Sequence, residues 1–323
     1  MLKKITIRKI GLTTLTLALF FLLCLIPDSN KDSLELNPKQ YIQYVNNEVD
    51  KHEIYLLDKD SYVARTKIVL SDHSENIVKK AKELLEVLII SGKGEKTIPN
   101  GFRAILPVDV EILNIEIDDN IMIVDFSKEL LDINKEYEET MIEAIIYTLT
   151  SIDGIEGVKI LINGKPLEYL PQNNKKLPEL LDRNHGINKD YNITTYNNIT
   201  ATTIYYINKH NNEYYYVPVT KYSNDNREKI KIIIDELSSG PIYESNLMSF
   251  LNTNTKLLNH ELKDKALSLE FNNYILSDLD DNNILEEVIY SISLSVADAY
   301  NIEEVIFYVN KEEVYKSVLK DIE

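Results

Sequence analysis

The chain has 323 residues, 44% of them hydrophobic, and a formal net charge of −17 at neutral pH, which fits two packed domains. The negative charge disfavours binding to nucleic acid or to an anionic membrane surface, because both need clustered basic side chains. The single cysteine excludes an internal disulfide, and nine glycines are few for a fold that holds phosphate groups on a glycine-rich loop.

The first 27 residues have the pattern of a membrane-targeting signal. Four basic side chains precede an apolar run at residues 10–26, which Pro27 ends. This is a positive n-region followed by an apolar h-region, and about 17 apolar residues are near the lower limit for a spanning helix. Because basic flanks stay in the cytoplasm, we expect residues 10–26 to contact the cell membrane and the bulk of the chain to lie on its extracytoplasmic face.

Three fates of this segment are open. An uncleaved signal anchor is favoured, because no small-x-small cleavage site follows the apolar run. Lipidation at Cys24 is the alternative, although Leu23 is larger than the small residue that normally precedes a lipoprotein cysteine. Cleavage and release is the third. Residues 28–50 are polar and charged without a sustained period, which predicts a tether.

The first predicted domain covers residues 51–170 and begins with a strand at Glu53–Leu57. A helix is predicted at residues 75–90, because its apolar residues recur at a spacing that lines one helical face. Asp72 or Ser74 can cap the start of this helix, and Gly92 lies where a C-terminal cap is expected.

Two further strands, a helix and a closing strand complete the first domain. The strands are predicted at residues 110–117 and 121–126, joined by the turn-forming Asp118-Asp119-Asn120. A second helix follows at residues 135–151, and the closing strand lies at residues 158–162. Asn163-Gly164 directly after it is a strong hairpin signal.

Residues 171–201 are rich in asparagine and are predicted as the linker, and residues 202–323 form the second domain. This domain repeats the order of elements of the first. It opens with a hairpin made of two strands and continues with alternating apolar patterns of helix and strand type. The predicted elements are strands at 203–207 and 214–219, a helix around Ile230–Leu237, a strand at 267–271, a helix at 285–296 and a closing strand at 305–309.

The two predicted domains are copies of one another. The segment at about residues 54–167 recurs in degraded form at about 203–314, at a nearly constant spacing that excludes a short-period solenoid. Six matches occur in the same order: Tyr55 with Tyr205, Leu88 with Leu237, Val124-Asp125-Phe126 with Leu269-Glu270-Phe271, Ile146-Tyr147 with Ile289-Tyr290, Val158 with Val305, and Lys165 with Lys311.

These patterns predict an α+β fold made of two tandem small domains after an N-terminal membrane segment. In each domain, the βαββαβ order favours an antiparallel or mixed sheet of three to four strands with two helices on one face. A chain made of two similar modules is more often a binding or assembly protein than an enzyme.

Motifs that carry chemistry are weak in this sequence. The histidines form neither an HxH nor an HExxH pair, so we expect them at the surface: His52, His73, His185, His210 and His260. Asp278–Asn283 resembles a calcium loop but lacks the required glycine and bidentate glutamate. Gly92–Thr97 lacks the ending of a phosphate loop, and Ser317–Lys320 lacks the partner motifs of penicillin-binding enzymes. We therefore predict no metal ligand, no cofactor and no catalytic residue.

Two further groups of side chains have competing interpretations. Asp125 and Glu270 occupy equivalent positions beside phenylalanines and are interpreted as solvent-facing acids on alternating strands, with binding of a cationic group as the alternative. Five tyrosines gather in the hairpin of the second domain and are the candidate partner surface, since tyrosine favours interfaces as well as strands: Tyr205, Tyr206, Tyr214, Tyr215 and Tyr216.

Several stretches of the first domain resemble the GerM domain of the sporulation and germination GerM family, in both order and spacing. The second domain resembles a divergent copy and keeps a Gly240-Pro241 turn after its first helix. It has Asn310 where the first domain has Gly164, and it lacks a clear counterpart of residues Gly101–Pro107. The stretches are Gly101–Pro107, Val124–Ser127, Ile146–Leu149 and Val158–Lys165.

The resemblance implies a membrane-attached, extracytoplasmic protein of an endospore-forming bacterium, with domains similar to ring-building modules. It implies a role in the complex that joins mother cell and forespore, with ring-forming domains among the protein partners. The resemblance brings no catalytic residues. We therefore predict a non-enzymatic, membrane-anchored binding or assembly protein. The alternatives are a cell-wall protein that binds peptidoglycan and, less favoured, a wall hydrolase.

Overall fold

The computed structural model describes residues 51–71, 76–241, 243–278 and 282–322. The predicted membrane-targeting signal, Cys24 and the tether lie outside the described residues. Within the described ranges, no helix combines the length and the apolar character needed to cross a membrane.

The first module, as we call the first predicted domain, begins with a hairpin. Strand β1 (Lys51–Asp58) pairs antiparallel with β2 (Val63–Val69), and the short β3 (Phe102–Arg103) pairs with the end of β1. Helix α2 (Ile77–Leu88) follows the hairpin and begins at Asn76, whose side chain accepts the Lys79 N–H. The predicted caps Asp72 and Ser74 lie outside the described residues, and the helix ends before Gly92.

A four-stranded mixed sheet forms the rest of the first module. Its order is β4–β5–β6–β7, in which β5 and β6 are parallel and the outer pairs are antiparallel. Helix α3 (Glu138–Leu149) makes the crossover between the parallel strands. It contacts both β1 and β6, so most of its residues are buried, and this explains why it carries buried polar residues. The strands are β4 (Ile112–Asp118), β5 (Ile121–Phe126), β6 (Gly157–Ile162) and β7 (Lys165–Pro166).

The second module repeats this plan strand by strand. It has a hairpin, two helices and a second four-stranded sheet in the order β11–β12–β13–β14, again with a central parallel pair. The elements are β9 (Thr200–His210), β10 (Glu213–Ser223), α4 (Lys229–Ser239), β11 (Leu257–Lys263), β12 (Ala266–Phe271), α5 (Glu286–Ala299), β13 (Glu304–Val309) and β14 (Glu312–Val318).

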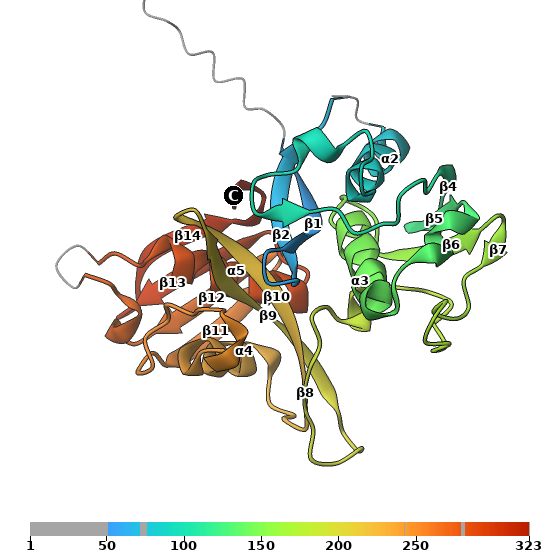
Figure 1. Ribbon diagram of the computed structural model, residues 1–323. Coiled ribbons are helices and arrows are strands. Elements are labelled where there is room, and N and C mark those ends of the chain that lie inside the picture. Colours follow the sequence, from blue (N-terminus) through green and yellow to red (C-terminus); the bar gives the residue numbers. More distant parts are fainter. Residues whose placement is uncertain (1–50, 72–75, 242, 279–281, 323) are drawn as a thin grey trace, which may run out of the picture. The chain divides into compact units, whose positions relative to one another are not determined.

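The two hairpins belong to one sheet. Its order is β3–β1–β2–β10–β8, with β9 paired to the other edge of β10 (Figure 1). Among the described residues, the backbone pairing between the modules is one antiparallel pair, Arg65 of β2 with Tyr216 of β10. The short β8 (Asp190–Asn192) comes from the predicted linker and runs parallel to the end of β10.

The α+β fold with mixed sheets and few helices is confirmed, and the structure adds detail that the sequence did not show. The opening strand of each module lies in the shared hairpin sheet and not in the four-stranded sheet. Strands β2, β11 and β14 were not predicted, and neither were the short strands β3, β7 and β8. The boundaries of the two domains stay a prediction.

One sequence match between the modules was wrong by one helical turn. The backbone N–H of Tyr55 donates to Thr148 Oγ1 at 3.0 Å, and that of the equivalent Tyr205 donates to Ser295 Oγ at 2.8 Å. Thr148 and Ser295 are therefore equivalent and lie 147 positions apart, whereas the Ile146–Ile289 match implies 143. A shift of four residues preserves the helical apolar pattern, so periodicity alone does not detect it.

Much of the predicted linker packs against the first module. Leu177, Leu181 and Ile187 are buried in its core. Leu181 and Val158 of β6 exchange two backbone hydrogen bonds, at 2.7 and 3.0 Å. These bonds occupy part of the edge of β6 that the two-residue strand β7 leaves open.

The core of the first module predicts the effect of a truncation in α2. Leu85→Ala removes a fully buried side chain and should lower the free energy of unfolding by about 2–5 kcal/mol, because a cavity replaces it. Lys82→Ala on the exposed face of the same helix is the matched control and should change stability by less than about 0.5 kcal/mol. Urea unfolding of both variants measures the difference, and equal values would contradict this packing.

Candidate functional site

The two hairpins contact one another through equivalent residues. The hydroxyl groups of Tyr55 and Tyr205 lie 3.1 Å apart, and these residues are 150 positions apart in sequence. The amide of Asn208 donates to Asp58 Oδ2 at 2.9 Å, and this pair has the same separation of 150. An interface in which a residue meets its own equivalent has the local symmetry of an isologous, two-fold contact.

Asp58 is the most densely hydrogen-bonded acid of this contact, and it is 1% exposed. Its Oδ1 accepts the backbone N–H groups of Asp60 and Tyr62, at 2.8 and 2.9 Å, within the first hairpin. Its Oδ2 accepts from Asn208 and from the Tyr215 hydroxyl, each at 2.9 Å, across the contact. Burial, together with the nearby Asp58 carboxylate, raises the pKa of Tyr215, so this hydroxyl stays a donor.

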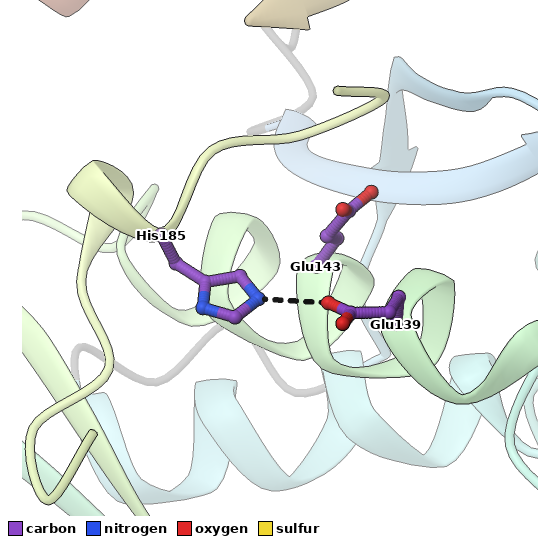
Figure 2. Close-up of side chains that lie close together, drawn as sticks. All are labelled: Glu139, Glu143 and His185. Atoms are coloured by element: carbon purple, nitrogen blue, oxygen red, sulfur yellow. Dashed lines mark ion pairs between the residues drawn. The ribbon is translucent and has the colours of Figure 1, made fainter. Parts of the chain in front are cut away.

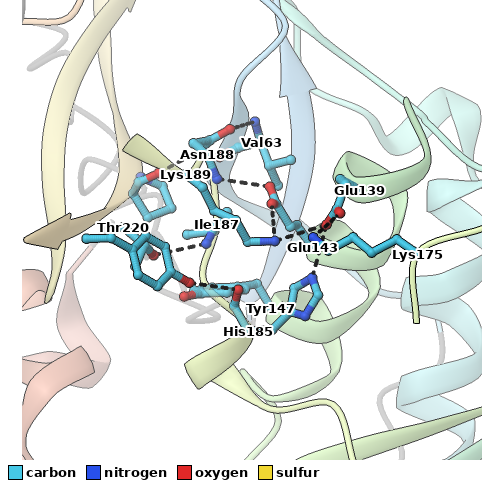
Figure 3. Close-up of polar contacts among 12 residues, drawn as sticks. Val63, Glu139, Glu143, Tyr147, Lys175, His185, Ile187, Asn188, Lys189 and Thr220 are labelled. Carbon is cyan, nitrogen blue, oxygen red and sulfur yellow. Dashed lines mark hydrogen bonds and ion pairs between the residues drawn. The ribbon is translucent and has the colours of Figure 1, made fainter. Parts of the chain in front are cut away.

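Asn188 from the predicted linker fills a break between β2 and β10. Pro218 of β10 has no N–H, so the ladder that joins Arg65 and Tyr216 does not continue there. Asn188 Oδ1 accepts the Val63 N–H at 2.9 Å, and its Nδ2 donates to the carbonyls of Val63 and Pro218 at 2.8 and 2.7 Å (Figure 3). One side-chain amide therefore replaces the missing backbone pairing.

Polar contacts on both sides hold the Asn188 segment in place. The Ile187 and Thr220 backbones bond at 2.8 Å, and the Ile187 N–H also donates to the Thr220 hydroxyl at 2.9 Å. The Asn188 N–H donates to Glu143 Oε2 of α3 at 2.9 Å. Asn188 has a φ of 45°, a left-handed conformation that asparagine tolerates better than most residues.

Glu139 and Glu143 lie one turn apart on α3 and face the linker residues His185 and Lys189 (Figures 2 and 3). Lys189 Nζ lies 3.0 Å from Glu139 Oε2 and 3.1 Å from Glu143 Oε1, so it bridges both carboxylates. Lys175 also pairs with Glu139. His185 Nε2 points at Glu139 Oε2 at 3.5 Å, and this side chain is only 8% exposed.

The Glu139, Glu143 and His185 side chains have the composition of a metal site, since one ligand atom of each lies within 4.8 Å of the others. The Lys189 ammonium, however, occupies the space between the two carboxylates and neutralises them together with Lys175. A divalent ion at the same oxygens would have to displace it. We therefore interpret the group as an ion-pair network that fixes the linker to α3.

The two glutamates respond differently to this network. The neighbouring His185 ring and the Lys175 and Lys189 ammonium groups hold the pKa of Glu139 well below its ordinary value. Burial raises the pKa of Glu143 although Lys189 opposes the shift. Desolvation outweighs the ion pair at Glu143 because its side chain is only 6% exposed, against 31% for Glu139.

Arg183 joins the linker to both modules. Its guanidinium lies over the ring of Tyr147, 4.8 Å from the centroid, and 5.9 Å from that of Tyr55. Its Nη1 pairs with Asp298 at the end of α5 at 2.9 Å, and its Nε donates to Thr150 at 3.1 Å. The linker is thus held by aromatic and ionic contacts from both repeats.

The structure changes the interpretation of the predicted tyrosine surface. Four of its members are buried, namely Tyr205, Tyr206, Tyr215 and Tyr216, while Tyr214 is 40% exposed. The five side chains therefore do not form one exposed patch. They are buried because Tyr205, Tyr215 and Tyr216 meet the first hairpin and Tyr206 packs in the core of the second module. Only for Tyr214, among these five, does a partner surface stay a prediction.

Two other residues singled out in the sequence, His185 and Asp125, have structural contacts. The His185 side chain is only 8% exposed, contrary to the expectation that all histidines lie at the surface. Asp125 accepts the Gly164 N–H at 2.9 Å and so supports the turn after β6. Sequence reasoning missed Asn188, Glu139 and Glu143; the four-residue spacing of the glutamates was visible in the sequence, but their lysine partner was not.

Fold and site together define a tandem-repeat α+β protein whose two modules are joined at equivalent hairpins. The Germane family model, described as sporulation and spore germination, matches residues 53–168 and 203–315. The spore germination protein GerM of Bacillus subtilis (strain 168) is 32% identical over 337 residues, which cover 93% of this chain and 90% of that protein.

A solved structure agrees with this match. The tandem GerMN domains of the sporulation protein GerM from Bacillus subtilis align with a TM-score of 0.73 and 33% identity, over 81% of this chain and 92% of that one. The chain therefore belongs to the Germane (GerM) family and is a sporulation or germination protein. The resemblance inferred from the sequence is confirmed.

Asn188→Ala should lower the free energy of unfolding by about 2–4 kcal/mol, because three buried backbone groups of Val63 and Pro218 lose their partner. The matched control is Asn198→Ala, which also replaces an asparagine at positive φ but in an exposed position. Denaturant unfolding measures both variants. If they lose stability equally, the loss belongs to the backbone conformation and not to the inserted amide.

Glu139→Gln should make stability less sensitive to acid. The folded-state pKa of Glu139 is lowered, so its ionised form stabilises the fold above the ordinary value of 4.5, and this contribution is lost as the pH falls below it. Glu143 has a raised pKa and acts in the opposite direction. Between about pH 7 and pH 4, the wild type should lose about 1 kcal/mol more than the variant.

Urea unfolding at both pH values measures this difference. Glu179→Gln is the control, because Glu179 is 90% exposed and pairs with Lys159 at 3.4 Å. A variant at position 139 with the acid sensitivity of the wild type would contradict the assigned network.

Proposed function

We propose that this chain is a non-enzymatic assembly protein of sporulation. It is anchored in the cell membrane through residues 10–26, or through a lipid on Cys24, and it presents its modules to protein partners on the extracytoplasmic face. The complex that joins mother cell and forespore is its site of action. Membership in a sporulation and germination family supports this proposal. The structural contacts of the buried acids Asp58 and Glu143 support it as well.

The single observation that carries the proposal is that these acids have structural partners, since Asp58 joins the two modules and Glu143 fixes the linker. The Asp58 carboxylate accepts four hydrogen bonds, and Glu143 binds the Asn188 N–H and Lys189. A glycoside hydrolase needs two carboxylates that face a substrate, one of them free to donate a proton. Glu139 and Glu143 are close enough, but Lys189 lies between them.

Exposed side chains recur at equivalent places in the two modules, which favours binding surfaces. Leu113 and Ile117 on β4 are 47% and 40% exposed, and Leu258 and Leu262 on β11 are 60% and 50% exposed. Each pair lies on the strand at the edge of its four-stranded sheet. Edge strands with exposed apolar side chains are suited to contact with another protein.

Crosslinking in sporulating cells tests the proposal. A photoreactive residue at Leu258 should capture extracytoplasmic membrane proteins, and the same probe at Tyr274, which is 55% exposed in the second module, is the control. A third probe at Tyr214 tests the remaining part of the tyrosine surface. An intact, correctly localised protein that captures nothing at Leu258 or Tyr214 would contradict an assembly role.

Binding to peptidoglycan is the alternative function, and sedimentation distinguishes it. The purified protein should stay in the supernatant when mixed with cell-wall material, whereas a wall-binding protein would sediment. Zymography of wild type and Glu143→Gln tests the less favoured hydrolase. A zone of lysis that is absent from the variant would replace the assembly proposal by an enzymatic one.

A further inference from the structure

The local two-fold symmetry of the hairpin contact bears on which other hairpins each hairpin can bind. Tyr55 meets Tyr205 and Asp58 meets Asn208, and both pairs are 150 positions apart. At these two positions, each hairpin therefore presents the equivalent of the residue that it binds. By geometry, such a surface can also meet the same hairpin of a second copy of the chain.

The tyrosine pair does not distinguish between these partners. A hydroxyl group both donates and accepts, so Tyr55 would fit another Tyr55 as well as it fits Tyr205. The Asp58 position does distinguish between them, because an ionised carboxylate only accepts. Two Asp58 side chains in this contact would place two buried acceptors of like charge at hydrogen-bonding distance, which is strongly unfavourable.

We propose that Asp58 and Asn208 are the specificity-determining pair of a module-recognition surface. The pair allows a first module to bind a second module and rejects the combination of two first modules. The partner that this surface fits is a Germane-type hairpin with an amide at the position of Asn208 and a hydroxyl at the position of Tyr205. This inference goes beyond the assembly role and does not depend on it.

Four hydrogen bonds fix the polarity of the pair. Asn208 Oδ1 accepts the Lys209 N–H at 2.8 Å, so Nδ2 is the end of the amide that faces the acids. Nδ2 donates to Asp58 and also to Asp60 Oδ2, at 2.9 Å each. Tyr215 supplies the second donor to Asp58 from the same hairpin. The second module thus contributes donors where the first module contributes acceptors.

Hydrogen exchange of the full chain in detergent tests the proposal with three variants. Asn208→Asp reproduces in the natural interface the acid–acid contact of two first modules. Its amides in β2 and β10 should exchange at least about 100-fold faster than in the wild type, in line with a buried unpaired charge. Amides in β5 and β12 report whether each module itself stays folded.

The exchanged variant D58N/N208D is the decisive comparison. Its amide at position 58 can donate to the new acid at position 208, so exchange in β2 and β10 should slow by at least about tenfold relative to N208D. D58N alone gives an amide–amide contact and should lie between the wild type and N208D. Asn259→Asp adds the same charge on an exposed part of β11 and should behave as the wild type.

Two results would overturn the proposal. N208D with wild-type exchange in β2 and β10 would show that the acid–acid contact is tolerated. A double variant that is no better protected than N208D would show that the two positions are not coupled. If N208D also loses protection in β5 and β12, the melting temperatures decide: D58N/N208D must melt above N208D, and an equal or lower value refutes the pairing.

Discussion

The insertion of Asn188 between Val63 and Pro218 is the interaction on which the joined modules depend. A proline in β10 stops the backbone ladder after the Arg65–Tyr216 pair, at a place where the strands are buried and unpaired groups are costly. The amide that restores the pairing comes from the linker, and the linker is positioned in turn by Glu143. Hairpins, linker and α3 are therefore parts of one polar arrangement, and a change in one part exposes unsatisfied groups in the others.

The buried position of α3 explains why this arrangement contains charges. The helix lies against both β1 and β6, so a side chain on either face is inside the protein. Glu143 reaches the linker from the face that a helix covering an open sheet would turn to water, and Lys189 supplies the compensating charge. A buried pair of this kind contributes little net stability but makes alternative linker positions unfavourable, since each would leave a charge unpaired.

Local sequence patterns were sufficient to predict the helices and strands whose apolar periodicity agrees with their burial. Strand β5 has the predicted bounds of residues 121–126, and the second hairpin and the four helices predicted within the two domains lie where expected. Strand β2 was missed because its centre, Arg65-Thr66-Lys67, is polar; Arg65 is nevertheless buried, since Glu53 and the Ile322 carbonyl lie 2.8 and 2.9 Å from its guanidinium. The Asn188 amide compensates for Pro218, which lies 30 positions away in the sequence, so no local sequence pattern predicts this contact.

The same duplication that made the fold recognisable also limits how its copies can diverge. In the four-stranded sheets, a difference such as Val124 in one copy and Leu269 in the other affects only the module that contains it. Each of these residues packs within the core of its own module. At the hairpins, position 58 faces its own equivalent at position 208, so a change in one copy alters the environment of the other. An identical acid at both positions would bring two buried carboxylates together and is disfavoured, whereas an acid opposite an amide is a stable solution. Once this difference is established, the two modules are no longer interchangeable, although their backbones still follow one plan.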